Sequence, residues 1–333
     1  MAKLTDEFVN TQLGVLPPNA DDDISLDEIN SFGDMESMRE VFKNIGAYNK
    51  MIKEKITFIN ADITACIPFT RENLYLMGAY SGHGKSTVAA NVSYPLWKEK
   101  KKSLIISNEE PKQDVLMRIA CLELGYNFND YKKGRMPAAI QRELVVLFPD
   151  ISKYVKIIDV NYKDGFTTKV QCIKNALTKV QNEDFSCAMI DYFQLIKYDT
   201  TKPGASNYEV LDHLRVWMGR YIKNSNIPIV LFAQLHSSEK RGKSLDGRIK
   251  DCPTIIEPAT VVIEVAPDFE NQTTSFIIHK DRFGMEGARI ICDFHKGRFI
   301  THDPDALRER QVEALDPTAV EEEVKEEAKN DQP

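Results

Sequence analysis

The sequence has no uninterrupted apolar stretch long enough to cross a membrane, since a transmembrane helix needs about 20 apolar residues in a row. Its first residues, MAKLTDEFVNTQ, lack the charged start and apolar run of a signal peptide. The six cysteines form no C-x-x-C pair and have no zinc-ligand spacing. We therefore expect a cytoplasmic protein without membrane contact, whose cysteines stay reduced.

The formal net charge of −7 argues against a general nucleic-acid coat protein, but the charge is unevenly distributed. Residues 1–37 contain nine acidic residues and one lysine, and residues 305–333 contain ten acidic and four basic residues. The segment between them, 38–304, therefore has a net charge of +7. A mildly basic body lies between two acidic ends.

Composition divides the chain into four segments. Residues 1–35 are acidic and have few periodic apolar positions, which predicts a flexible segment. Residues 58–304 contain the regular patterns of a folded domain, and residues 305–333 predict a disordered acidic tail. Between the first two lies a predicted amphipathic helix, 36–57, whose apolar residues recur every three or four positions: Met38, Val41, Phe42, Ile45, Tyr48 and Met51.

Short apolar runs alternate with amphipathic stretches from residue 74 to residue 234. Such alternation is typical of a mainly parallel sheet with helices on both faces. After residue 260 only strands are predicted, so the fold class is α/β with antiparallel strands at the C-terminal edge. The pattern predicts strands at 74–79, 103–107, 155–160, 186–191, 228–234, 261–265, 274–280, 288–294 and 298–300, and helices at 85–99, 112–124, 137–148, 167–181 and 207–224.

The segment AYSGHGKST, residues 79–87, follows a predicted strand and precedes a predicted helix. It has the pattern of a phosphate-binding loop, in which glycines let backbone N–H groups approach phosphate oxygens. Lys85 would contact the β- and γ-phosphates, and the hydroxyl of Ser86 would bind Mg²⁺. Ala79 replaces the usual first glycine. The predicted nucleotide-binding residues of this loop are Ala79, Ser81, Gly82, His83, Gly84, Lys85, Ser86 and Thr87.

Three further polar residues follow predicted strands, where open α/β sheets bind their ligands. Glu109 is the predicted general base for hydrolysis; the alternative is that it and Glu110 are solvated acids at a helix start. Asp191 is a predicted nucleotide and Mg²⁺ ligand, or else it caps a turn. Gln234 would sense the γ-phosphate, or else it is a polar residue satisfied at a strand end. The predicted cofactors are therefore ATP and Mg²⁺.

These motifs, in this order, resemble the RecA-like motor domain of hexameric replicative helicases of superfamily 4, the DnaB type. The resemblance covers about residues 58–300 and implies a RecA-like P-loop NTPase fold. About seventy residues precede the motor, so we do not expect the family's N-terminal helical domain. The motifs are AYSGHGKST, Ser107-Asn108-Glu109, the Walker B strand IDYFQL at 190–195, Ala233-Gln234-Leu235 and Lys280-Asp281-Arg282.

The resemblance also implies roles that the patterns alone do not assign. Lys280 and Arg282 would reach the triphosphate of an adjacent subunit as a trans arginine finger, which implies a homo-oligomer, expected to be a hexameric ring. The helix at 36–57 would be the linker helix that docks on a neighbour. The loops at 197–207 and 236–250 would line a channel for single-stranded DNA. In the second loop, the predicted DNA contacts are Lys240, Arg241, Lys243, Arg248 and Lys250.

The first functional hypothesis is an ATP hydrolase that couples hydrolysis to translocation on single-stranded DNA and to duplex unwinding. The alternatives are a RecA-like recombinase that pairs strands in open filaments, and a nucleotide-switched replication regulator or loader without unwinding activity. Further expected partners are a primase, a loader or a single-strand-binding protein. A compact motor of this kind would suit a phage or plasmid replication system acting in a bacterial cytoplasm.

Overall fold

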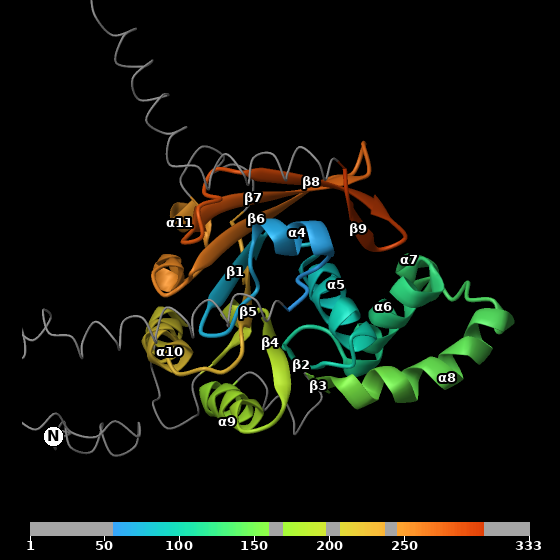
Figure 1. Ribbon diagram of the computed structural model, residues 1–333, viewed down its shortest axis with the longest axis horizontal. Coiled ribbons are helices and arrows are strands. Elements are labelled where there is room, and N and C mark those ends of the chain that lie inside the picture. The colour runs from blue at the N-terminus through green and yellow to red at the C-terminus, as the bar shows by residue number, and fades with distance from the viewer. Residues whose placement is uncertain (1–55, 160–168, 198–206, 237–244, 303–333) are drawn as a thin grey trace, which may run out of the picture. The chain divides into compact units, whose positions relative to one another are not determined.

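The computed structural model describes residues 56–159, 169–197, 207–236 and 245–302 (Figure 1). These residues form an α/β domain built on a sheet with the strand order β3-β2-β4-β5-β1-β6-β7-β8-β9. The predicted flexible segment, the predicted tail and nearly all of the predicted linker helix lie outside the described residues.

Neighbouring strands are parallel from β3 to β6 and antiparallel from β6 to β9. This confirms the predicted fold class and its antiparallel C-terminal edge. The strands are β1 (Leu74–Ala79), β2 (Lys102–Ser107), β3 (Val155–Ile158), β4 (Phe185–Asp191), β5 (Ile229–Gln234), β6 (Val261–Asp268), β7 (Thr273–Asp281), β8 (Arg289–His295) and β9 (Arg298–Thr301).

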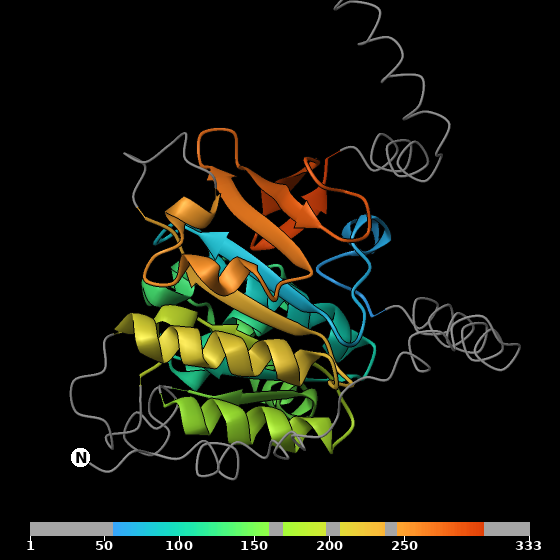
Figure 2. The same ribbon diagram turned by 90° about the vertical axis from the view of Figure 1, so that its left-hand side faces the viewer.

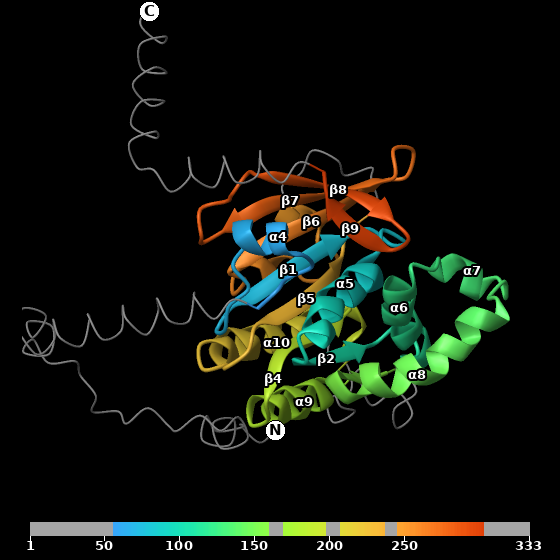
Figure 3. The same cartoon turned by 45° about the vertical axis from the view of Figure 1, so that its right-hand side comes forward.

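Helices cover both faces of the parallel part of the sheet: α5, α6 and α8 pack on one face, and α9 and α10 on the other (Figures 1 and 3). None of the described helices is long and apolar enough to cross a bilayer. The α-helices are α4 (Ala61–Cys66), α5 (Lys85–Lys98), α6 (Lys112–Leu124), α7 (Phe128–Lys132), α8 (Ala138–Tyr154), α9 (Val170–Gln181), α10 (Asn207–Ile222) and α11 (Leu245–Arg248), with 3₁₀ turns at Phe193–Leu195 and Pro253–Ile256.

The central strand β1 is buried on both faces. Tyr75 and Met77 belong to the core that contains α5, α6 and α8, whereas Leu74 and Leu76 belong to the core that contains α9 and α10. Successive side chains of a strand point to opposite faces, so a strand between two helical layers needs a continuous apolar run. Figure 2 shows α10, in yellow, in front of the strands on the second face.

The strands and helices predicted within the described residues are present, but some of their ends differ. The predicted helix at 137–148 is α8, which continues to Tyr154 although Pro149 lies inside it. A proline removes one backbone N–H and disfavours helix continuation. The last turn is nevertheless retained, because it buries Ile151 completely in the core beside α6. Tertiary packing therefore outweighs the local signal at this position.

Three aromatic rings hold the chain where it enters β1. The ring of Phe69 is fully buried, with its centroid 4.6 Å from that of Phe58 and 4.8 Å from that of Tyr75. The backbone N–H of Thr70 donates to the Tyr75 hydroxyl at 3.0 Å, and that hydroxyl donates to the carbonyl of Pro68. The cluster thereby ties the entry segment to the strand that leads into the phosphate loop.

We predict that Phe69→Ala lowers the free energy of unfolding by about 3–5 kcal/mol, because the truncation leaves a cavity between two rings that cannot collapse into it. Val146→Ala is the control: Val146 is 75% exposed on α8, so its truncation should change stability by no more than about 0.5 kcal/mol. Urea denaturation followed by circular dichroism measures both. Equal losses in the two variants would contradict the role of the aromatic cluster.

Candidate functional site

The predicted site residues lie where the carboxyl ends of four neighbouring strands meet. In the register of the sheet, Ala79 at the end of β1 is beside Gln234 at the end of β5, and Ser107 at the end of β2 is beside Asp191 at the end of β4. The backbone N–H of Asn108 also donates to the Asp191 carbonyl at 2.6 Å. This edge is where open parallel sheets bind ligands.

The phosphate loop connects β1 to α5. Gly82 and Gly84 have φ angles of +76° and +87°, values that other residues adopt only with strain. The backbone N–H of His83 donates to the Tyr80 carbonyl at 3.1 Å, which closes the turn. No side chain in the described part of the chain caps α5, whose N-cap is Gly84. The first backbone N–H groups of this helix therefore remain available to bind an anion.

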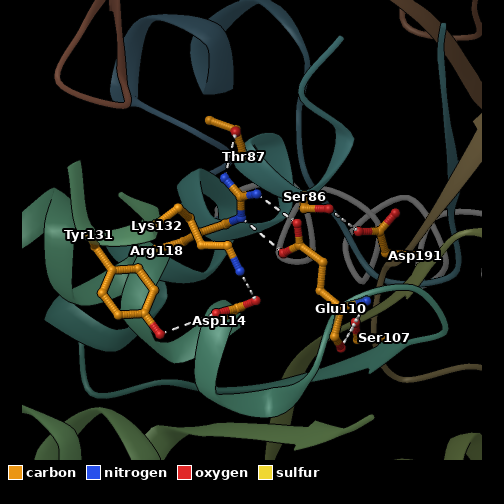
Figure 4. A network of polar contacts seen from close by, with 9 residues as sticks. All are labelled: Ser86, Thr87, Ser107, Glu110, Asp114, Arg118, Tyr131, Lys132 and Asp191. Atoms are coloured by element: carbon orange, nitrogen blue, oxygen red, sulfur yellow. Dashed lines mark hydrogen bonds and ion pairs between the residues drawn. The ribbon is translucent and has the colours of Figure 1, made fainter. Parts of the chain in front are cut away.

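Lys85, Ser86 and Asp191 come together at the start of α5. The Ser86 hydroxyl donates to Oδ2 of Asp191 at 2.7 Å (Figure 4). Lys85 is buried, and its ammonium lies 5.1 Å from the ring centroid of Tyr192. Burial lowers the pKa of Lys85, while the nearby carboxylates of Asp191 and Glu109 oppose that shift. A buried cation at the first turn of a helix is suited to a polyanionic ligand.

Asp191 is almost completely buried, and its Oδ1 atom has no hydrogen-bond partner among the described residues. Burial raises the pKa of this carboxyl group to about 6, against the lowering effects of the Ser86 hydrogen bond and the Lys85 charge. An unpaired buried carboxylate oxygen is costly. Asp191 thus has an oxygen available for a further ligand.

The chemistry of these groups fits Mg²⁺. Mg²⁺ prefers oxygen ligands, and it usually binds through one or two carboxylates, waters and substrate phosphates. Ser86 and Asp191 supply two adjacent oxygens at the mouth of the phosphate loop. No cluster of three or more metal-ligating side chains occurs within the described residues. A cation here would therefore complete its coordination with phosphate oxygens and water.

Glu109 and Glu110 have different environments, although they are adjacent in sequence. Glu109 is exposed and lines the cavity at the phosphate loop. Glu110 instead forms a bidentate pair with Arg118, with N–O distances of 2.9 and 2.6 Å (Figure 4). The hydroxyl of Ser107 holds the backbone of Glu110 at both its N–H and its carbonyl. Of the two, Glu109 therefore has the carboxylate that is free to act on a ligand in this cavity.

Sequence reasoning missed Arg118. This residue of α6 contacts Glu110 and the Thr87 hydroxyl, the latter at 3.4 Å, and its guanidinium lies 3.9 Å from the ring centroid of Phe128. It therefore places a second cation beside the phosphate loop. Its spacing from Glu110 gives no sequence signal, because the two residues meet only after β2 has turned into α6.

Gln234 lies at the sheet edge as predicted, and a second glutamine holds it there. The backbone N–H of Gln234 donates to the side-chain oxygen of Gln194 at 3.0 Å. The side-chain nitrogen of Gln194 donates to the carbonyls of Gln234 and Lys250, each at 3.0 Å. Gln194 belongs to the Walker B motif, but the sequence did not indicate this role. It fixes the end of β5 beside β4.

A cavity of about 620 Å³ extends from the phosphate loop, past Glu109 and α6, to the turn between β8 and β9. Its size is within the range of pockets that bind small ligands and cofactors. Gly82 to Thr87 line one end, so these predicted nucleotide-binding residues and Glu109 face a single space. Phe128, Phe269, Phe294 and Phe299 supply apolar surface elsewhere in its lining.

Lys280 and Arg282 lie away from this cavity. Asp281 pairs with Val261, which in turn pairs with Tyr75 near the start of β1, whereas the phosphate loop follows the end of β1. Asp281 is therefore about 13 Å from the start of the phosphate loop along the strands, and two strand spacings, or roughly 10 Å, from it across them. The ammonium of Lys280 donates to two backbone carbonyls, and Arg282 is exposed. The chain therefore does not bring these cations to its own phosphate loop.

The structure separates the five predicted DNA-binding residues. Lys240, Arg241 and Lys243 lie outside the described residues, and Lys250 is exposed. Arg248, in contrast, is 8% exposed and forms a bidentate pair with Glu264. The expectation that Arg248 is a loop cation available to DNA is therefore corrected. Its charge is already neutralised within the fold.

A sequence profile of the DnaB-like helicase C terminal domain matches residues 58–299. The chain therefore belongs to the family of DnaB-like helicases, as its motifs indicated. No curated protein matches the sequence.

Two solved structures share this fold. One, described as an ATPase domain, is 18% identical with a TM-score of 0.63, over 85% of this chain and 100% of that chain. A DnaB-like replicative helicase, described with its interactions with primase, is also 18% identical with a TM-score of 0.63, over 80% of this chain and 66% of that chain. The RecA-like fold implied by the resemblance is thereby confirmed.

We predict that Asp191→Asn stabilises the nucleotide-free protein at pH 8. The folded protein binds a proton at Asp191 more tightly than the unfolded chain does, so ionisation of this buried group destabilises the fold as the pH rises through about 6. Removing the charge should raise the free energy of unfolding by up to about 3 kcal/mol at pH 8 and by little at pH 4. The measurement is urea denaturation at both pH values without Mg²⁺. Glu286→Gln, at an exposed carboxylate, serves as the control, and a gain of equal size at both pH values would contradict the prediction.

Proposed function

We propose that the protein is an ATP hydrolase that couples hydrolysis to translocation on single-stranded DNA and to unwinding of the duplex ahead. The observation that carries this proposal is the contact of Ser86 with the buried Asp191, beside Lys85 and facing the exposed Glu109. This arrangement supports a site in which a triphosphate, a cation and an attacking water would meet. Membership of the DnaB-like helicase family supports the coupling to DNA.

Each side chain has a separate task in the proposed reaction. Backbone N–H groups of the phosphate loop and the ammonium of Lys85 bind and orient the triphosphate. Ser86 and Asp191 would hold Mg²⁺, which neutralises charge on the phosphates when it is bound. The carboxylate of Glu109 orients a water and accepts its proton as the water attacks the γ-phosphorus. Gln234 acts as the γ-phosphate sensor from the end of β5.

The proposed site needs a second subunit. Arg282 is exposed and lies at the opposite end of the sheet from the phosphate loop of its own chain. With Lys280, it would instead stabilise the transition state in a neighbouring chain, a contribution worth about 10³–10⁵ in rate for an arginine finger. We therefore propose a homo-oligomer, with a hexameric ring as its form. The helix at 36–57 would dock on the neighbour.

Single-stranded DNA is the proposed polymer substrate. Lys240, Arg241, Lys243 and Lys250 are the proposed contacts to its phosphates, because lysine and arginine bind the backbone without reading the bases. One solved structure that shares the fold is described with its interactions with primase. A primase, a loader or a single-strand-binding protein are therefore proposed as further partners, and the bacterial cytoplasm as the place of action.

We predict that ATP hydrolysis rises when single-stranded DNA is added, and that Lys85→Ala abolishes it, because the triphosphate loses its principal cationic contact. Lys98→Ala is the matched control: Lys98 is the last residue of the same helix, and its side chain is 48% exposed. Phosphate release measures turnover, and strand displacement from a forked duplex measures unwinding. Hydrolysis without displacement would favour a nucleotide-switched regulator, and filaments in negative-stain images would favour a recombinase.

We predict that Lys85→Ala and Arg282→Ala proteins are each inactive alone but regain activity when mixed. In a mixed oligomer, an intact phosphate loop from one variant meets an intact Arg282 from the other, which restores about a quarter of the sites if subunits assort randomly. Phosphate release from the mixture measures the recovery.

Two controls make this mixing experiment decisive. A double variant carrying both changes, mixed with Lys85→Ala protein, should recover nothing, because no chain then has an intact phosphate loop. Arg289→Ala changes another exposed arginine, at the start of β8 near the end of β7 that precedes Arg282. This variant should stay active. An active Arg282→Ala protein on its own would refute the trans finger.

A further inference from the structure

Arg248, near the end of the 236–250 loop proposed to contact DNA, is held in a buried ion pair. Its two terminal nitrogens donate to both carboxylate oxygens of Glu264 at 2.7 and 2.6 Å. One of them also donates to the hydroxyl of Tyr80 at 3.3 Å. Bidentate, charge-assisted hydrogen bonds of this kind fix orientation as well as distance. Arg248 therefore has one defined geometry in the fold.

The partner of Arg248 is itself held in place. Glu264 is a buried residue of β6, and its Oε2 atom also lies 2.9 Å from Nε2 of His279 on β7. Burial tends to raise the pKa of Glu264, but hydrogen bonds with His279 and Arg248 outweigh it and lower the pKa to about 2. The carboxylate is therefore charged at neutral pH. Withdrawing Arg248 would leave a buried negative charge without its main counter-charge.

The backbone of Arg248 belongs to the base of the same segment. Its carbonyl accepts the backbone N–H of His236 at 2.7 Å, and the N–H of Lys250 donates to the carbonyl of Gln234 at 3.0 Å. Leu235 and Ile249 form a bridge between these two hydrogen bonds. The backbone just after β5 is thus hydrogen-bonded to the backbone at 248–250. Arg248 belongs to this paired base of the segment.

The same guanidinium also reaches the beginning of the phosphate loop. Tyr80 follows the last residue of β1, and its carbonyl accepts the N–H of His83 in the loop's first turn. One side chain therefore contacts β6 and the start of the phosphate loop, while its backbone anchors the segment after β5. Of the two described residues that the sequence predicted to bind DNA, Arg248 and Lys250, only Lys250 has the exposure that a phosphate contact requires.

We propose that Arg248 is a positioning residue and not a DNA ligand: through Glu264 and Tyr80 it fixes the base of the 237–250 segment against the phosphate loop, so that DNA bound by this segment changes the rate of hydrolysis. The inference rests on the proposed function. It adds to that function a residue that physically connects the DNA-binding segment with the phosphate loop.

The test compares Arg248→Lys with Lys250→Gln. Lysine keeps the positive charge but cannot form the bidentate pair. We expect Arg248→Lys to lower the stimulation of kcat by single-stranded DNA at least about fivefold, with little change in the KM for ATP or in the salt dependence of DNA affinity. Lys250→Gln should instead keep its stimulation at saturating DNA and reduce the slope of log affinity against log salt by about one charge.

Two further variants keep the test decisive if Arg248→Lys folds poorly. Glu264→Gln removes the charge that orients Arg248 and should lose stimulation to a similar extent. Tyr80→Phe keeps the ion pair and removes only the contact to the phosphate loop, so its stimulation should fall between those of the wild type and Arg248→Lys. Thermal melting accompanies every assay. A lower melting temperature with full stimulation in these variants would overturn the inference, since that result identifies a merely structural ion pair.

The outcomes separate this inference from the proposed function. Wild-type hydrolysis that does not respond to single-stranded DNA overturns the proposed function, and with it the inference. A responsive wild type whose Arg248→Lys variant responds equally overturns the inference alone. A shallower salt slope in an Arg248→Gln variant, which removes the charge, together with intact stimulation likewise overturns the inference, because Arg248 would then be a DNA ligand.

Discussion

The hydrogen bond between Ser86 and the buried Asp191 is the interaction on which the candidate site depends. It joins the first turn of α5 to the end of β4, segments that are 105 residues apart in the sequence. Its formation requires β1 and β4 to be held in register on either side of β5, and two apolar cores provide that support. The two apolar cores thus hold Asp191 at a buried position, although burying its carboxylate costs free energy. Any ligand that neutralises Asp191 would return part of that free energy as stability.

The two carboxylates that follow β2 show how one short segment can serve two purposes. Glu110 is neutralised by Arg118, which stiffens the start of α6 against the phosphate loop. Glu109 is thereby left as the exposed acid facing the cavity. In the proposed reaction, Glu109 must be free to accept a proton, and the backbone that holds it must be rigid. Adjacent residues meet these opposite requirements because only one of them is paired within the fold.

Much of the fold and several site residues could be predicted from the sequence. Central strands were recognisable from continuous apolar runs, and the phosphate loop from glycines between a strand and a helix. The residues that escaped prediction or were misplaced depend on contacts between distant elements. Arg248 has a basic, loop-like neighbourhood in sequence, and it meets Glu264 only once β6 lies beside β1. The pairing of β6 with β7 then adds His279 as a second partner of Glu264. Gln194 and Arg118 likewise acquire their roles from strands and helices that converge at the sheet edge. Helix α8 continues beyond Pro149 for the same reason, since tertiary contacts bury Ile151 in its last turn.

The placement of Arg282 has a geometric consequence for assembly. The phosphate loop and this arginine lie at opposite ends of the sheet, so in the proposed oligomer each chain would contribute two different surfaces. A twofold dimer pairs one patch with its own copy, so it could complete its sites only if a single patch contained both surfaces. A head-to-tail contact can join them, but an open series of such contacts leaves one unmatched surface at each of its ends. Only closure of the series removes those ends, and in the proposed oligomer closure is therefore what gives every subunit a complete site.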